Sequence, residues 1–127
     1  MDKLSFDRSI WTSIESCNRW IEKAQSEVRN NYEISSPTFQ NNLSNLMDIS
    51  EGLIANCKNF KTYPFVDLVE KIAEEILITS DLILSKIERG TMDRRVVGVQ
   101  LELLKKKVKE LKDTYAKIVS NEQRKAA

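Results

Sequence analysis

The chain has 127 residues, of which 41% are apolar and 31% are charged, with only three glycines and two prolines. This length suits one domain with a continuous core, and the scarcity of turn-forming residues favours long helices over a β fold. Twenty basic against nineteen acidic side chains leave a net charge of +1, which excludes a general electrostatic attraction to nucleic acid or to anionic membranes.

Histidine is absent from the chain. Its absence removes the commonest general base and the usual nitrogen ligand of zinc. A Gly-rich phosphate loop, a Cys-x-x-Cys pair and a nucleophile elbow are also missing. We therefore expect a protein that is not an enzyme and that uses no cofactor and no metal.

The two cysteines, Cys17 and Cys57, lie in different predicted helices and on the apolar side of each. This placement favours buried thiols in a reducing compartment over a disulfide or a lone nucleophile. No apolar segment of the signal-peptide type follows Met1, and the longest apolar window, 76–84, is too short to cross a bilayer. We expect an intracellular, cytoplasmic protein without membrane contact.

The first predicted helix covers residues 5–29, with Ser5 as its N-cap and Asp7 in its first turn. Its apolar residues recur at spacings of three and four, a period that a strand does not produce. The stripe consists of Phe6, Ile10, Ile14, Cys17, Ile21, Ala24 and Val28. Trp11 and Trp20 flank it, where each either covers a seam between helices or anchors a partner.

The second predicted helix covers residues 36–60, and Ser36-Pro37 marks its start. Serine is a good N-cap, and proline fits the first helical position because its missing N–H is not needed there. The apolar stripe of this helix contains Phe39, Leu43, Leu46, Leu53, Cys57 and Phe60. Ser50 takes the one polar position within that stripe.

The third predicted helix covers residues 64–89 and begins at Pro64 in the same way. Its broad apolar face carries Phe65, Val66, Val69, Ile72, Ala73, Ile76, Leu77, Ile83, Leu84 and Ile87. Gly90 follows, and glycine most readily adopts the left-handed conformation of a helix C-cap. Four carboxylates fall on the opposite, outward arc, namely those of Asp67, Glu70, Glu74 and Asp81. Outward carboxylates do not build a metal site inside a bundle.

The fourth predicted helix covers residues 91–121, with Thr91 as its N-cap and Asp93 in its first turn. Seven apolar residues follow at alternating spacings of four and three, which is typical of left-handed, coiled-coil-like packing. They are Val97, Leu101, Leu104, Val108, Leu111, Tyr115 and Ile118. Residues 122–127 are expected to fray.

Four helices of similar length joined by short connections predict antiparallel neighbours. The longest predicted loop is the run 29–36, which contains poor helix formers and has no apolar period. We therefore expect an all-α protein, an antiparallel up-down-up-down four-helix bundle formed by a single domain over residues 1–127.

A second apolar face is predicted on the two helices that flank Gly90. With successive residues about 100° apart around a helix, six side chains fall outside the main stripes. They are Ile78, Leu82, Met92, Val96, Val99 and Leu103. Either the first two helices cover this face, or it is exposed and binds a partner's amphipathic helix or the same hairpin of a second copy.

A basic stripe on the fourth helix offers a different site. It consists of Arg94, Lys105, Lys109 and Lys112. A row of this kind suits phosphate groups. Acidic residues interrupt the stripe at Glu102, Glu110 and Asp113, and no aromatic residue interleaves for base stacking. Charge that complements the acidic third helix is the competing interpretation.

The sequence thus predicts a non-catalytic protein–protein interaction or assembly module, an adaptor or accessory subunit. It would use the second apolar face to bind another protein or to form a homo-oligomer. The alternative is a nucleic-acid-binding accessory protein that uses the basic stripe. Steeply salt-sensitive retention on a phosphate resin, abolished by charge reversal at Lys105 and Lys109, would favour that alternative. The partner, the pathway and the number of copies stay open.

Overall fold

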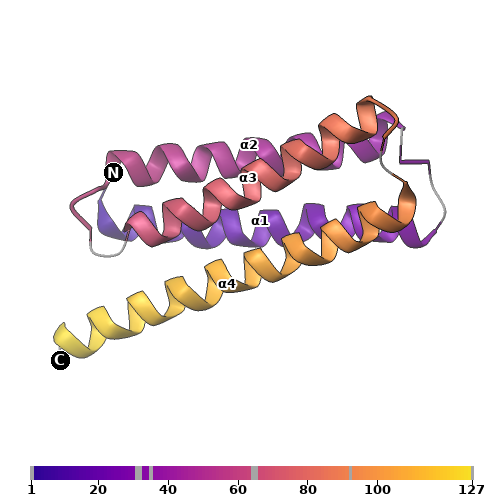
Figure 1. Ribbon diagram of the computed structural model, residues 1–127. Coiled ribbons are helices and arrows are strands. Elements are labelled where there is room, and N and C mark those ends of the chain that lie inside the picture. The colour runs from indigo at the N-terminus through magenta and orange to yellow at the C-terminus, as the bar shows by residue number, and fades with distance from the viewer. Residues whose placement is uncertain (1, 31–32, 35, 64–65, 92, 127) are drawn as a thin grey trace.

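Figure 1 shows a computed structural model of the chain, which describes residues 2–30, 33–34, 36–63, 66–91 and 93–126, with side chains as far as residue 120. The described residues form the helices α1 (Lys3–Arg29), α2 (Pro37–Asn59), α3 (Val66–Glu88) and α4 (Arg94–Ala126). Successive helices run in opposite directions, and their connections alternate between the two ends (Figure 1). The packed pairs are α1–α2, α2–α3, α3–α4 and α1–α4, which close a ring. The predicted four-helix bundle is confirmed.

The start of α1 lies earlier than predicted, because Asp2 and not Ser5 is the N-cap. The Asp2 carboxylate accepts a hydrogen bond from the Ser5 backbone N–H at 2.8 Å, and this bond lowers the pKa of Asp2. Aspartate and serine are comparable caps, so the sequence alone did not separate them. The predicted cap of α2 is confirmed, since the Ser36 hydroxyl accepts from the Phe39 N–H at 3.2 Å with Pro37 next to it. The predicted start of the third helix at Pro64 and Phe65 lies outside the described residues.

The turn between α3 and α4 is centred on Gly90, which has a φ of 70° as predicted for a left-handed C-cap. The backbone N–H of Thr91 donates to the Lys86 carbonyl at 2.9 Å, and its hydroxyl donates to the same oxygen at 3.2 Å. Thr91 therefore completes α3, and the prediction that it caps α4 is wrong. Asp93 is the cap, because its carboxylate accepts from the Val96 N–H at 2.9 Å.

The C-terminal end of α4 extends further than the sequence suggested. We expected the helix to end near residue 121 and the tail to fray, but the backbone is helical through Ala126. Glycine and proline are absent from residues 119–126, so the chain contains no local stop signal there. Each helical residue adds about 1.5 Å to the length of α4. The added residues carry the end of α4 past the first turn of α1, as Figure 1 shows.

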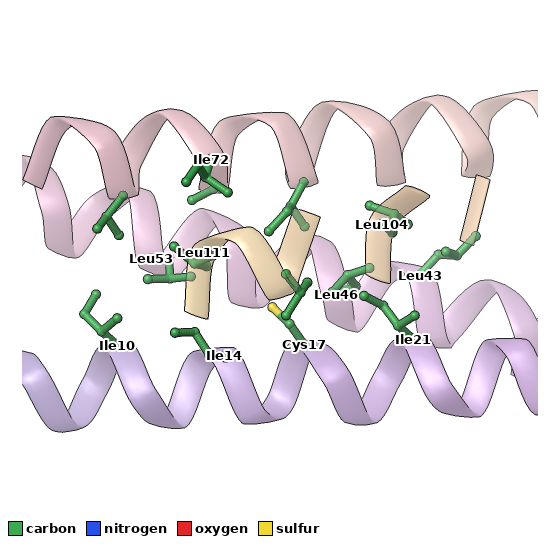
Figure 2. Packing of buried hydrophobic residues seen from close by; sticks show 14 of the residues in the cluster. Ile10, Ile14, Cys17, Ile21, Leu43, Leu46, Leu53, Ile72, Leu104 and Leu111 are labelled. Atoms are coloured by element: carbon green, nitrogen blue, oxygen red, sulfur yellow. The ribbon is translucent and has the colours of Figure 1, made fainter. Parts of the chain in front are cut away.

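The core lies between the four helices and is built from the predicted stripes. Figure 2 shows side chains from every helix pointing into the same space, with the Cys17 sulfur among leucines and isoleucines. All seven stripe residues of α4 are buried, from Val97 to Ile118. Two buried polar residues, Ser50 and Ser80, donate to the carbonyls of Leu46 and Ile76 at 2.9 and 2.7 Å. Each serine thus satisfies its hydroxyl within its own helix.

None of the helices in the described part of the chain is apolar over a stretch long enough to cross a bilayer. The two thiols are buried and free, as predicted. Burial raises the pKa of Cys17 to about 12. Burial, and next the negative charge of Glu70, raises the pKa of Cys57 to about 11. Both values lie above the ordinary 9.0, so the folded state holds these thiols in the protonated form.

These pKa shifts predict slow thiol chemistry in the folded chain and a loss of stability at high pH. The unfolded chain releases the thiol protons first as the pH rises, so unfolding is favoured from pH 9 upward and increasingly toward pH 12. A timed reaction with an aromatic disulfide, with and without denaturant, checks the first effect. Urea unfolding at pH 7, 9 and 10 checks the second. Rapid labelling of either thiol in native buffer would contradict the burial.

Candidate functional site

The relative register of α3 and α4 is given by an ion pair between the two helices. The Lys107 Nζ lies 2.7 Å from the Glu75 carboxylate. The two helices are antiparallel, so residue numbers rise toward the Gly90 turn on α3 and fall toward it on α4. Seven positions from Glu75 toward the turn is Leu82, and seven positions from Lys107 toward the turn is Gln100, so Leu82 and Gln100 lie at the same height along the bundle. Moving three residues in the same way places Ile78 level with Leu104. The second apolar face of α3 therefore lies beside that of α4.

Five of the six predicted face residues are exposed, and Met92 lies outside the described residues. The exposed fraction is highest for Ile78 at 65% and Val99 at 56%. We call this set the hairpin ridge, and it consists of Ile78, Leu82, Val96, Val99 and Leu103. Helices α1 and α2 pack on the other sides of the hairpin, so the interpretation that they cover this face is wrong for these five side chains.

A groove of about 320 Å³ runs along the ridge between α3 and α4. It is lined by Thr79, Gln100, Leu103, Lys106, Lys107 and Glu110. Leu103 thus belongs to both the ridge and the groove, while the charged residues lie on the side away from the Gly90 turn. The ridge is apolar and the adjoining part of the groove is charged, an arrangement that can hold a partner helix and also fix its position.

Two further aliphatic side chains are exposed, and neither belongs to the second apolar face predicted from the sequence. Leu4 is on the first turn of α1, and Leu68 is near the start of α3. Ten residues separate Leu68 from Ile78, a distance of about 15 Å along the helix. Single exposed leucines are common on soluble proteins, whereas a contiguous group is not. Leu68 therefore serves as a matched control for the ridge.

The basic stripe is divided between two places. Lys105, Lys109 and Lys112 are exposed and line a groove of about 450 Å³ beside α1. The same groove also contains Lys106, Asn18, Glu22, Glu102 and Asp113. Arg94 has a structural partner instead, because its guanidinium donates to the Val28 carbonyl at the end of α1 at 2.7 Å. Three carboxylates among four ammonium groups leave little net charge for phosphates.

One predicted surface carboxylate is buried. Glu70 was placed on the outward arc of α3, but it is only 8% exposed. The Lys61 ammonium, from the connection that precedes α3, hydrogen-bonds both Glu70 and Asp67, and these two hydrogen bonds raise the pKa of Lys61. The lysine side chain thus covers a carboxylate that helical periodicity alone would leave in water. Within the described residues, no group of acidic or cysteine side chains is arranged to hold a metal.

The other end of the bundle carries a polar and aromatic cluster that joins α1 to α4. The Tyr115 hydroxyl donates to the Asp7 carboxylate, which also accepts from the Lys3 ammonium at 2.6 Å. Trp11 meets the Tyr115 ring edge-on, with ring centroids 5.3 Å apart. This contact favours the interpretation of Trp11 as a cover for a helix seam. Helical spacing gives no sign of this cluster, because 108 positions separate Asp7 from Tyr115.

The second tryptophan lies on the opposite side of α1 and also packs against the core. The Lys23 ammonium lies 4.5 Å from the centroid of the Trp20 ring, which is therefore partly covered by its own helix. Neither tryptophan is part of the hairpin ridge. Among the described residues, the ridge remains the largest group of exposed aliphatic side chains.

No protein-family model matches this chain, and no curated protein or solved structure matches it.

Proposed function

We propose that this protein is a non-catalytic interaction module, an adaptor or accessory subunit that binds protein through the hairpin ridge. The supporting observation is the exposure of five aliphatic side chains on two adjacent helices close to one turn. The remaining large aliphatic residues of these helices, Leu68 excepted, are buried or half-buried. A contiguous apolar group on a small domain is typical of a surface that is covered in the working assembly.

The expected strength of this contact follows from the exposed side chains. Each ridge residue is roughly half exposed, so covering it would contribute about 1 kcal/mol, half of the value for full burial. The five together would contribute about 5 kcal/mol, and a partner of similar chemistry would add a comparable amount. Association itself costs about 4–15 kcal/mol. At the smallest association cost about 6 kcal/mol is left, so we expect reversible binding with a dissociation constant of roughly tens of micromolar or weaker.

The test compares the wild-type chain with two single substitutions of matched chemistry. Val99→Glu places a charge on the ridge, and Leu68→Glu places the same charge on an exposed leucine of α3 outside it. Proteins that bind wild type in the source cells are purified and titrated against all three chains. We expect Val99→Glu to weaken binding at least tenfold and Leu68→Glu to leave it unchanged. Equal affinities for all three chains would contradict the proposal.

Nucleic-acid binding is the second candidate, and the convergence of Lys105, Lys109 and Lys112 on one groove favours it. The acidic residues in that groove oppose it. We expect the chain to elute from a phosphate resin at low salt, and Lys105→Glu with Lys109→Glu to change the elution little. Strong retention that falls steeply with salt and disappears in this double variant would establish the nucleic-acid candidate instead.

A further inference from the structure

We propose that the partner on the hairpin ridge is a second copy of this chain, related by a two-fold axis parallel to the helices. In this arrangement α3 of one copy packs against α4 of the other. The two hairpins form a new four-helix contact, with their Gly90 turns at the same end. The inference rests on the proposed function and specifies its partner.

The first supporting observation is that the apolar ridge residues of α3 and those of α4 lie at the same height along the bundle axis. A two-fold axis parallel to the helices keeps every residue at its own level, so the ridge of one copy meets the ridge of the other. Leu82 lies level with Val99 and Gln100, and Ile78 lies level with Leu103 and Leu104, by the register of the Glu75–Lys107 pair. Leu82 would therefore face Val99 of the second copy, and Ile78 would face Leu103.

The second observation is the charge pattern beyond the apolar part. Residues seven apart lie on the same side of a helix. One such step away from the turn leads from Leu82 to Glu75 and from Ile78 to Lys71 on α3. The same step on α4 leads from Val99 to Lys106 and from Leu103 to Glu110.

The two-fold arrangement places opposite charges together in both of these positions. Glu75 faces Lys106 of the second copy, because Leu82 faces Val99. Lys71 faces Glu110 of the second copy, because Ile78 faces Leu103. Lys71, Lys106 and Glu110 are exposed, and Glu75 is half-buried. Glu75 and Glu110 also pair with Lys107 of their own copy, at 2.7 and 3.5 Å, so in the dimer the lysines of the second copy would join these ion pairs. A surface that complements itself in both apolar and charged positions is what an isologous contact requires, whereas an unrelated partner does not require it.

The experiment measures solution mass by light scattering from micromolar to millimolar chain concentration. We expect wild type to pass from monomer to dimer within this range, Leu68→Glu to behave like wild type, and Val99→Glu to stay monomeric. Circular dichroism and urea unfolding confirm that each variant is folded. Folding is expected to persist because both sites are exposed.

Charge reversal tests the orientation. Lys71→Glu and Glu110→Lys each place like charges together twice in the dimer, and each is expected to weaken dimerisation about tenfold. Combining both substitutions restores the opposite pairing and should return the dissociation constant to near the wild-type value. A dimer that Val99→Glu disrupts but that these charge reversals do not affect would overturn this orientation while supporting the ridge as an interface.

Two other results would overturn the inference. One is a wild-type chain that stays monomeric over the whole concentration range. This result leaves the proposed function intact, because binding to a different protein is tested separately by the titrations of Val99→Glu and Leu68→Glu. The other is a dimer whose mass is unaffected by Val99→Glu, since it would place the contact elsewhere on the chain.

Discussion

Ile76→Ala is expected to lower the free energy of unfolding by about 2–5 kcal/mol, while Ile78→Ala changes it by less than about 0.5 kcal/mol. The two isoleucines lie two positions apart on α3, and the exposed fraction is 0% for Ile76 and 65% for Ile78. Truncating Ile76 removes buried methyl groups and leaves a cavity among core side chains. Truncating Ile78 removes groups that water already surrounds, and alanine is the better helix former.

Urea unfolding followed by circular dichroism measures both values at one pH and one low protein concentration. The low concentration keeps dimerisation from adding to the apparent stability of the wild-type chain. The residue type and helix are the same in both variants, so only burial differs. Similar losses for the two substitutions would mean that the face bearing Ile78 is buried, and the ridge would then not be available to a partner.

Tyr115→Phe is expected to lower the free energy of unfolding by about 1.5 kcal/mol, near the lower end for a hydrogen bond to a charged group. Tyr115 is only 2% exposed, and its hydroxyl donates to the Asp7 carboxylate. Phenylalanine keeps the edge-on contact with Trp11. The Asp7 side chain is 23% exposed and keeps its ion pair with Lys3, so water replaces part of the lost interaction.

A double-mutant cycle with Asp7→Ala isolates this pair, because alanine has no oxygen to accept from the Tyr115 hydroxyl. We expect the two single substitutions together to cost more than the double variant, because each one alone already breaks the same hydrogen bond. Strictly additive losses would show that the hydroxyl and the carboxylate do not act together in solution. The same cycle leaves the hairpin ridge untouched, so the solution mass of each variant should follow that of wild type.

Helix periodicity predicted most of the fold because it is a local property of the chain. Each helix repeats every 3.6 residues, so the stripe from Val97 to Ile118 could be assigned from spacing alone and is buried throughout. The same arithmetic placed Val99 and Leu103 off that stripe. Caps were less certain, as Asp2 and Thr91 show, because several good capping residues lie close together at each helix end.

Contacts between distant parts of the chain could not be predicted in this way. The bond from Tyr115 to Asp7 and the bond from Arg94 to the Val28 carbonyl each depend on how α4 packs against α1. The burial of Glu70 depends on the position of Lys61 in a connection that has no helical period. Such contacts follow from the relative placement of helices, which spacing within one helix does not determine.

The sequence by itself determined that this protein is helical, which side chains form its core stripes, and which apolar residues near Gly90 fall outside them. Only the tertiary structure decided that Ile78, Leu82, Val96, Val99 and Leu103 face solvent. The physical reason is that a helical wheel gives the direction of a side chain from its own axis, whereas exposure depends on whether another helix occupies that direction. The ring of contacts among α1, α2, α3 and α4 leaves this side of the hairpin open.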